Sequence, residues 1–303
     1  MDHQVAESVG MTGRGTTRIA AVMAAHNRRE LTLACLRSLR AQRVPDVLLD
    51  VFVLDDASSD GTGEAIAERF PEVTVLCGDG KLYWNGGMRR AFGEAIAGDY
   101  DYYLWMNDDT TLDDGALALL LETERQVRQR EDDAVIVAGA IRDPETGRLT
   151  YGGAVRPHRW RPLRWEPVEP GDTPRPCETM NGNTVLLSRA VVRRVGNLDP
   201  AFTQQMGDFD YGLRARKAGC SVWTTPGTVG TCAPHPRRRT DQQPLLQELR
   251  RLWSIKELSP RPWATFTRRW AGTLWPLYWL SPYVRRGSRL LLERRPLRRL
   301  VGP

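Results

Sequence analysis

The chain has 303 residues, 41% of them hydrophobic, which is enough to bury a substantial core in one α/β domain with an appendage or in two equal domains. Residues 1–17 contain no apolar segment of signal-peptide length, so we interpret them as a mobile polar leader. The five cysteines are scattered without CxxC spacing, which argues against a zinc ribbon and a disulfide scaffold. A globular protein of the reducing cytoplasm fits these features best.

The net charge of +6 is distributed unevenly along the chain. Residues 235–303 contain 16 Lys and Arg against 4 Asp and Glu, so this segment carries +12 and residues 1–234 carry −6. An acidic body therefore carries a basic tail. Such a tail can meet nucleic acid or an anionic membrane surface, or it can remain a solvated face without a partner.

Strand and helix patterns alternate through the first half of the chain. The apolar run at residues 19–25 leaves no room for a helix and predicts a buried strand, whereas "ELTLACLRSLR" has helical spacing over residues 30–40. Further strands are predicted at residues 48–54, 73–77, 102–106 and 135–140, and further helices at 62–70, 85–97 and 115–129. This alternation is typical of βαβ units and predicts an α/β fold with a mostly parallel, Rossmann-like sheet flanked by helices.

The second half begins with an irregular segment. Residues 157–176 are rich in Pro, Arg and Trp, so we predict no regular element there and interpret the segment as a working loop or a spacer. A strand at 184–187, helices at 189–195 and 208–218, and a strand before His235 are predicted beyond it.

Polar segments fall at the predicted carboxyl ends of strands and at the start of a late helix. They are "AHNRR" at 25–29, "LDDASSDGT" at 54–62, "NDD" at 107–109 and "GDFDYGLR" at 207–214. Each alone suits ordinary turn and helix-cap chemistry. Their joint placement favours a ligand site, because open α/β sheets bind ligands at the carboxyl ends of their strands.

These segments, in this order, resemble the inverting family 2 glycosyltransferases with the GT-A fold. "VMAAHNRRELTLACLRSLRAQ" and "VFVLDDASSDGTGEAI" resemble the family's opening, and "LYWNGGMRRAFGEAI...DYYLWMNDDT" resembles the middle of its bacterial rhamnosyltransferase-like branch. "NGNTVLLSRAVVRRVGNLDPAF" and "GDFDYGLRARKAG" are similar to its acceptor loop and late catalytic helix. The resemblance implies a catalytic domain at 18–235, with a nucleotide-binding half at 18–140 and an acceptor half at 141–235, before a basic aromatic helical extension at 236–303.

The resemblance also implies which residues bind the donor. Asp55 would accept the imide N–H of a uracil or thymine base, and Asp56 would lie beside it in the nucleotide pocket. Asn27 and Arg28 would lie near the nucleoside and the diphosphate. Gly86 and Gly87 would let the donor approach the backbone closely, and Arg89 and Arg90 could meet its phosphates, with a solvated side chain as the alternative for one of the two.

A divalent cation belongs to the same implied site. Asp109 would occupy the second acidic position of the family's DxD motif and bind Mg²⁺ or Mn²⁺ bridging the diphosphate. Asn107 stands where the first acid often is, and Asp108 would either assist or only shape the loop. His235 lies about where some relatives place a third metal or phosphate ligand, with an ordinary surface histidine as the alternative.

Inversion at a sugar carbon needs a base on the face opposite the leaving group, to take the proton of the acceptor hydroxyl. Asp208 matches the aspartate with this role in the family; a simple helix cap is the alternative. Gly207 replaces the family's preceding acid, so Asp210 is the nearest substitute carboxylate on the acceptor side. Gly182 and Asn183 would line the sugar or acceptor pocket.

The tail combines aromatic residues with arginines. Its apolar run at 270–284 contains glycine and two prolines and is shorter than the roughly 20 residues that span a bilayer. Aromatics interleaved with arginines are typical of segments in the headgroup zone, which predicts peripheral contact with the inner face of the cell membrane through residues 263–299. The alternative is a helical pair that packs these aromatics on the catalytic domain, and no nucleic acid is expected.

The sequence thus predicts a metal-dependent enzyme that moves a sugar from dTDP-rhamnose or a UDP-sugar to a saccharide or lipid-linked acceptor for cell-surface glycan synthesis. A soluble aglycone as acceptor, or a non-catalytic carbohydrate- or nucleotide-binding protein, remains open. A nucleotidyltransferase is disfavoured because "AAHNRREL" is no Gly- and Arg-rich phosphate loop. An NAD-dependent enzyme is disfavoured because GxGxxG does not follow the first predicted strand.

Overall fold

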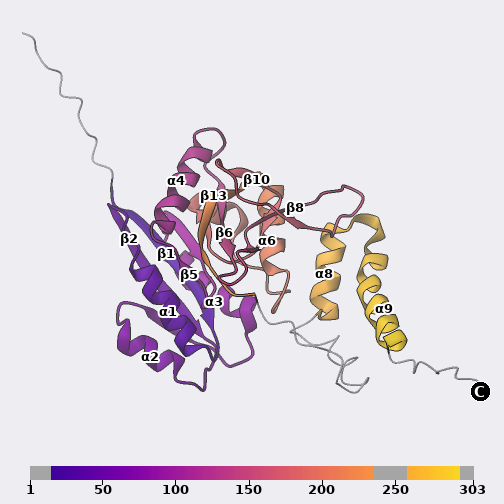
Figure 1. Ribbon diagram of the computed structural model, residues 1–303, viewed down its shortest axis with the longest axis horizontal. Coiled ribbons are helices and arrows are strands. Elements are labelled where there is room, and N and C mark those ends of the chain that lie inside the picture. The colour runs from indigo at the N-terminus through magenta and orange to yellow at the C-terminus, as the bar shows by residue number, and fades with distance from the viewer. Residues whose placement is uncertain (1–14, 235–257, 294–303) are drawn as a thin grey trace, which may run out of the picture.

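The computed structural model describes residues 15–234 and 258–293 (Figure 1). Three sequence predictions therefore fall outside the described residues in whole or in part. These are the leader up to residue 14, the ligand role of His235, and the extension at 236–257 and 294–303.

The first half of the chain builds four parallel strands in the order β3-β2-β1-β4. They are β1 (Thr17–Ala25), β2 (Val47–Asp55), β3 (Thr74–Cys77) and β4 (Tyr102–Trp105), connected by α1 (Arg29–Arg40), α2 (Thr62–Arg69) and α3 (Tyr83–Ala97). Each of these elements begins within two residues of its predicted start. The α/β fold with flanking helices is confirmed.

Both faces of the sheet are covered because alternate residues of a strand point to opposite sides. On β1, Ala20 and Val22 belong to the core beneath α3, whereas Ile19, Ala21 and Met23 belong to the core beneath α1. The layer with α1 also contains α2 and α4 (Ala116–Arg128), and the layer with α3 also contains α5 (Arg189–Val195) and α6 (Gly207–Lys217).

The second half adds strands of mixed direction to the same sheet. β12 (Val185–Ser188) lies between β4 and β6 (Val135–Arg142) and is antiparallel to both, while β13 (Ser221–Thr231) runs parallel to β6 on its other side. Shorter strands complete the fold: β5 (Thr111–Leu112), β7 (Leu149–Tyr151), β8 (Gly153–Val155), β9 (Glu166–Pro167), β10 (Arg175–Cys177) and β11 (Thr179–Met180). Residue 183, just before β12, thereby comes close to residue 107, just after β4.

The prediction that residues 157–176 form no regular element was wrong at two points. β9 contains Pro167 and pairs with β8 at the edge of a small three-stranded sheet, and β10 contains Pro176 and pairs with β13 at the edge of the large sheet. Proline lacks an N–H group and is therefore tolerated in edge strands. Counting prolines alone could not reveal that both segments lie at edges.

The described part of the extension is helical, as predicted. It consists of α8 (Pro260–Trp270), the short 3₁₀ helix η1 (Gly272–Leu274) and α9 (Trp275–Glu293), and Figure 1 shows the two longer helices side by side at one end of the molecule. Phe266 is 1% exposed and shares a small core with Phe202 and Leu213 of the catalytic domain. The aromatic side of α8 therefore packs on the domain. No helix among the described residues is long and apolar enough to span a membrane.

Candidate active site

The loops after β1 and β2 are joined through Asn27. This residue adopts a positive φ of 52°, which asparagine tolerates better than most residues. Its backbone N–H donates to the Ser58 hydroxyl at 2.9 Å, and its side-chain oxygen accepts from the Ser59 N–H at 2.7 Å. Asn27 therefore fixes the two loops relative to each other at the carboxyl edge of the sheet.

Asp55 and Asp56 have different environments although they are neighbours. Asp55 ends β2, is partly exposed, and accepts from the Ser58 N–H at 3.1 Å and from the Ser58 hydroxyl through one oxygen. Asp56 is only 5% exposed. Its oxygens accept from three backbone N–H groups, those of Gly80 at 2.8 Å, Leu82 at 2.9 Å and Tyr83 at 3.1 Å. Asp56 thus builds the loop that leads into α3.

Arg28 lies against the acidic pair that follows β4. Its Nη1 donates to Asp109 Oδ2 at 2.7 Å and to Asp108 Oδ1 at 3.2 Å. The two carboxylate side chains are only 9% and 6% exposed. Burial raises the pKa of Asp108 to about 7, although Arg28 acts in the opposite direction. The other Asp109 oxygen accepts from the Cys232 thiol at 3.3 Å.

This pair fits a cation that is shared with a diphosphate. Carboxylate oxygens are the ligands that Mg²⁺ and Mn²⁺ prefer, and the guanidinium of Arg28 contacts both carboxylates, so the point between them favours positive charge. Among the described residues, no group of three or more His, Cys, Asp or Glu is arranged to hold a metal alone. A metal bound here would need ligands beyond these two carboxylates, and the predicted additional ligand His235 is outside the described residues.

Asn107 connects the start of α3 to the loop before β12. Its Oδ1 accepts from Trp84 Nε1 at 2.9 Å, and its backbone N–H donates to Asn183 Oδ1 at 3.2 Å. Asn183 is 1% exposed and also accepts from the Thr110 hydroxyl at 2.8 Å. The buried side chain of Asn183 therefore stabilises the loop at residues 107–110.

Asp208 stands in the first turn of α6 and is partly exposed. Its Oδ2 accepts from the Gly182 N–H at 2.9 Å, and its Oδ1 accepts from the Phe209 N–H at 2.8 Å. The surrounding protein raises its pKa above the ordinary value of 3.8, although both N–H groups oppose the shift. A Cβ at residue 182 would collide with the Trp84 indole, so glycine is needed where the loop passes between this ring and Asp208.

Gly207 packs against the side chain of Asn85. A Cβ at residue 207 would collide with the side-chain amide of Asn85, which donates to the backbone oxygens of Phe202 at 2.8 Å and Asp199 at 3.1 Å. The amide occupies the space that a larger residue at 207 would need. Residue 207 must therefore be small where α6 packs against α3.

Three other predicted site residues make contacts with the surrounding protein. Asp210, predicted on the acceptor side, is 0% exposed, and both its oxygens accept hydrogen bonds from side chains of α6 and α8. Gly87 lets α3 approach the sheet, since a Cβ there would lie 2.8 Å from Ala24 Cβ. The Arg89 side chain is exposed, and its backbone oxygen accepts from Asn197 at 2.9 Å.

Sequence reasoning missed Trp84 as a site residue. Its indole contacts both Asn107 and the Gly182 backbone, so it lies between the donor side and Asp208. The only local signal is an aromatic residue just before the predicted helix in "LYWNGG". Nothing near Arg269 in the sequence marks it as a partner of α6.

Comparison with known proteins shows the family of the chain. The family model described as glycosyl transferase family 2 matches residues 20–196, more than half of the chain. The chain belongs to glycosyl transferase family 2 and is a glycosyltransferase, as the resemblance implied.

A sequence relative and several solved structures are similar to the chain. The N-acetylglucosaminyl-diphospho-decaprenol L-rhamnosyltransferase of Mycobacterium tuberculosis (strain H37Rv) is 28% identical over 207 residues, which cover 60% of this chain and 64% of the relative. The match thus spans less than two thirds of that protein's length.

The solved structures show the GT-A fold. The crystal structure of GalNAc-T7 with UDP, GalNAc and Mn²⁺ has a TM-score of 0.57 at 13% identity and covers 94% of this chain and 59% of that one. The mannosyltransferase PcManGT from Pyrobaculum calidifontis, in complex with GDP-Man and Mn²⁺, has a TM-score of 0.51 at 18% identity and covers 85% and 65%.

The contrast between Asp55 and Asp56 predicts opposite effects of the same substitution. Asp56→Asn places an amide donor against backbone N–H groups and should lower the free energy of unfolding by about 1–3 kcal/mol. Asp55→Asn keeps one oxygen for Ser58 and should change it by less than about 1 kcal/mol. Urea unfolding followed by tryptophan fluorescence measures both; equal losses would contradict the assignment.

Proposed function

We propose that the protein is a metal-dependent inverting glycosyltransferase that moves rhamnose from dTDP-rhamnose, or a hexose from a UDP-sugar, to a hydroxyl of a lipid-linked saccharide. The observation that carries the proposal is the arrangement of three carboxylates, those of Asp55, Asp109 and Asp208. Asp55 and Asp109 lie at the carboxyl ends of parallel strands, and Asp208 is held by the loop that Trp84 covers. The name of the mycobacterial relative supports rhamnose and a lipid-linked acceptor.

On the donor side, each residue has a distinct task. Asp55, which is partly exposed at the end of β2, accepts the imide N–H of the pyrimidine. Asp109, with Asp108 beside it, would hold Mg²⁺ or Mn²⁺. The bound metal would neutralise the charge that develops on the departing diphosphate. Arg28 forms ion pairs with both carboxylates. When the donor and the metal bind, its guanidinium would turn from these carboxylates to the phosphates.

On the acceptor side, Asp208 is the proposed base. Its carboxylate takes the proton of the acceptor hydroxyl while that oxygen attacks the anomeric carbon, and the bond from this carbon to the diphosphate oxygen breaks on the opposite face. The nucleoside diphosphate carries away the bonding electron pair, so the anomeric configuration inverts. The N–H groups of Gly182 and Phe209 keep the carboxylate oriented during this step.

Binding of nucleotides tests the proposed donor class. We expect dTDP or UDP with Mn²⁺ to raise the melting temperature more than GDP or ADP, because Asp55 selects a pyrimidine imide; a ligand at 100 times its Kd stabilises by about 2.7 kcal/mol. Asp109→Ala should remove the part of the shift that depends on Mn²⁺. The exposed carboxylate of Asp114 provides the control, since Asp114→Ala should leave the shift unchanged.

A thermal-shift assay with and without Mn²⁺ measures these effects. The absence of any stabilisation by any nucleotide, in either metal condition, would contradict the proposed function and favour a non-catalytic protein.

The raised pKa of Asp208 predicts how the rate depends on pH. A base works only when it is deprotonated, so kcat should fall as the pH decreases through the pKa of Asp208, which burial places above 3.8. The acid limb should therefore appear at a higher pH than for an ordinary aspartate. Measuring kcat with saturating donor at decreasing pH checks this, and a flat profile down to pH about 4 would argue against Asp208 as the base.

We propose further that α9 meets an anionic membrane surface where the lipid-linked acceptor resides. Leu277, Leu280 and Val284 lie on one side of the helix at spacings of three and four residues and are 65%, 47% and 56% exposed. The exposed residues Arg285 and Arg286 follow directly. An exposed apolar stripe beside arginines suits the headgroup zone of the inner leaflet. Side chains from residue 289 onward are outside the described residues.

Flotation with vesicles that contain phosphatidylglycerol tests this contact. Leu277→Asp with Leu280→Asp should lower the partition coefficient roughly 100-fold, because burying each leucine contributes about 1.5–3 kcal/mol. Leu31→Asp is the control, since Leu31 is 52% exposed on α1 and far along the sequence from α9. Equal partitioning of the double variant and the wild type would remove the support for membrane contact.

A further inference from the structure

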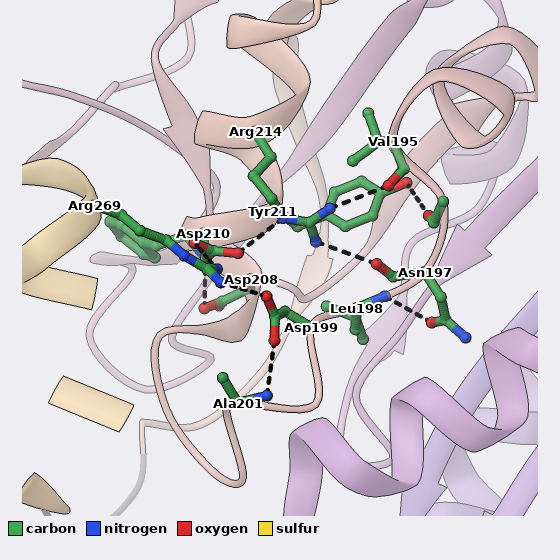
Figure 2. Close-up of polar contacts among 12 residues, drawn as sticks. Val195, Asn197, Leu198, Asp199, Ala201, Asp208, Asp210, Tyr211, Arg214 and Arg269 are labelled. Carbon is green, nitrogen blue, oxygen red and sulfur yellow. Dashed lines mark hydrogen bonds and ion pairs between the residues drawn. The ribbon is translucent and has the colours of Figure 1, made fainter. Parts of the chain in front are cut away.

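The buried carboxylate of Asp210 joins α6 to the C-terminal helices. Asp210 is 0% exposed. Its Oδ2 accepts from Arg214 Nε at 2.8 Å, and its Oδ1 accepts from Arg269 Nη1 and Trp270 Nε1, each at 3.0 Å. Figure 2 shows Arg269 reaching from α8 to this carboxylate. A buried charge needs such partners, so the contact is a strong constraint on both helices.

Arg269 binds a second carboxylate at the same time. Its Nη2 donates to Asp199 Oδ2 at 2.7 Å, and Asp199 Oδ1 accepts from the Ala201 N–H at 2.7 Å (Figure 2). Burial acts to raise the pKa of Asp199, but the Ala201 N–H and Arg269 together hold it below the ordinary value. One guanidinium thus ties α6 to the loop that leads into it.

This loop and the first turn of α6 carry the proposed base. The Asp210 N–H donates to the Met206 oxygen at 2.9 Å, and Met206, the residue before the helix, has a positive φ of 70°. Asp208 lies between these two residues in the sequence, and its carboxylate accepts a hydrogen bond from the Gly182 N–H. Any movement of the turn therefore changes the position of the Asp208 carboxylate.

We infer that Arg269 is a positioning residue for the transfer reaction, which fixes the first turn of α6 and so places Asp208 for proton abstraction. This inference rests on the proposed function of Asp208. Arg214 and Trp270 remain bonded to Asp210 when Arg269 is lost, so the helix stays folded while its tie to the loop disappears. The C-terminal helices lie beyond the family match at 20–196. Through Arg269 they would then help to position the catalytic base.

Kinetics of the full-length chain test the inference. Arg269→Met keeps the apolar stem near Phe202 but removes both ion pairs, and kcat should fall about tenfold or more, since small displacements of a catalytic group are costly. The KM and Kd for the sugar nucleotide should stay within about twofold, because the donor residues belong to other elements. Arg269→Lys should restore kcat in part, because one ammonium lacks the fork that reaches two carboxylates.

Arg268 supplies a matched control. It is the neighbouring arginine on α8 and is exposed like Arg269, but the ion pairs with Asp199 and Asp210 are made by Arg269, so Arg268→Met should leave all these values unchanged. A kcat of Arg269→Met within twofold of the wild type would overturn the inference. A loss of donor affinity as large as the loss of kcat would also overturn it, because the effect would then be a general loss of structure.

Hydrogen exchange separates this inference from the proposed function. In Arg269→Met, peptides that cover residues 181–184 and 205–213 should exchange about tenfold faster, while those from β4 should not change. Unchanged exchange in these peptides would overturn the positioning role whatever the enzyme's activity. If exchange rises as expected but the wild type transfers no sugar, the positioning contact stands and the proposed function fails.

Discussion

The antiparallel pairing of β12 with β4 is the constraint on which the site depends. Val185 pairs with Trp105, so the loop before β12 lies beside the loop after β4. Asn183 then accepts from Asn107, and its neighbour Gly182 donates to Asp208. Helix α6, which begins more than 100 residues after the end of β4, is thereby brought to the edge where Asp55 and Asp109 lie. Without β12 in the middle of the sheet, the two halves would not form one site.

The carboxylates around this edge differ in how the protein already neutralises them. Asp56 and Asp210 each accept three hydrogen bonds from protein donors and are almost fully buried, so their charge stabilises the structure. Asp55 and Asp208 are partly exposed and are bonded by their neighbouring loops. In these two pairs, burial together with the number of protein donors therefore separates Asp56 and Asp210 from Asp55 and Asp208.

Local sequence patterns predicted much of the fold for a physical reason. Side-chain periodicity reflects which faces are buried, so the predicted strands and helices of the first half begin within two residues of their predicted positions, although the two-residue strand β5 was not predicted. The order of the strands was not predictable in this way, because the place of β12 is decided by contacts across the whole sheet. The short edge strands β9 and β10 escaped prediction for the same reason.

The site was predictable down to segments but not to individual side chains. Asp55 and Asp56 are the same residue type at adjacent positions, and their different environments come from the backbone at Gly80 and beyond. Asp208 and Asp210 share one helical turn, yet only Asp210 meets Arg269, which lies 59 residues away in the sequence. A sequence pattern of acidic residues predicts where carboxylates cluster. The role of each carboxylate depends on partners that lie far away in the sequence.

The most direct measurement compares donor binding and sugar transfer in two variants. Asp208→Asn should bind the sugar nucleotide within about twofold of the wild type but transfer sugar 10²–10⁴-fold more slowly, because only proton abstraction is lost. Asp55→Ala should weaken donor binding by about tenfold or more, because a hydrogen bond to a charged group is lost. Calorimetry with the donor and a transfer assay with a lipid-linked saccharide give both values. Transfer at the wild-type rate by Asp208→Asn, or equal loss of donor affinity in both variants, would contradict the assignment of proton abstraction to Asp208 and of donor binding to Asp55.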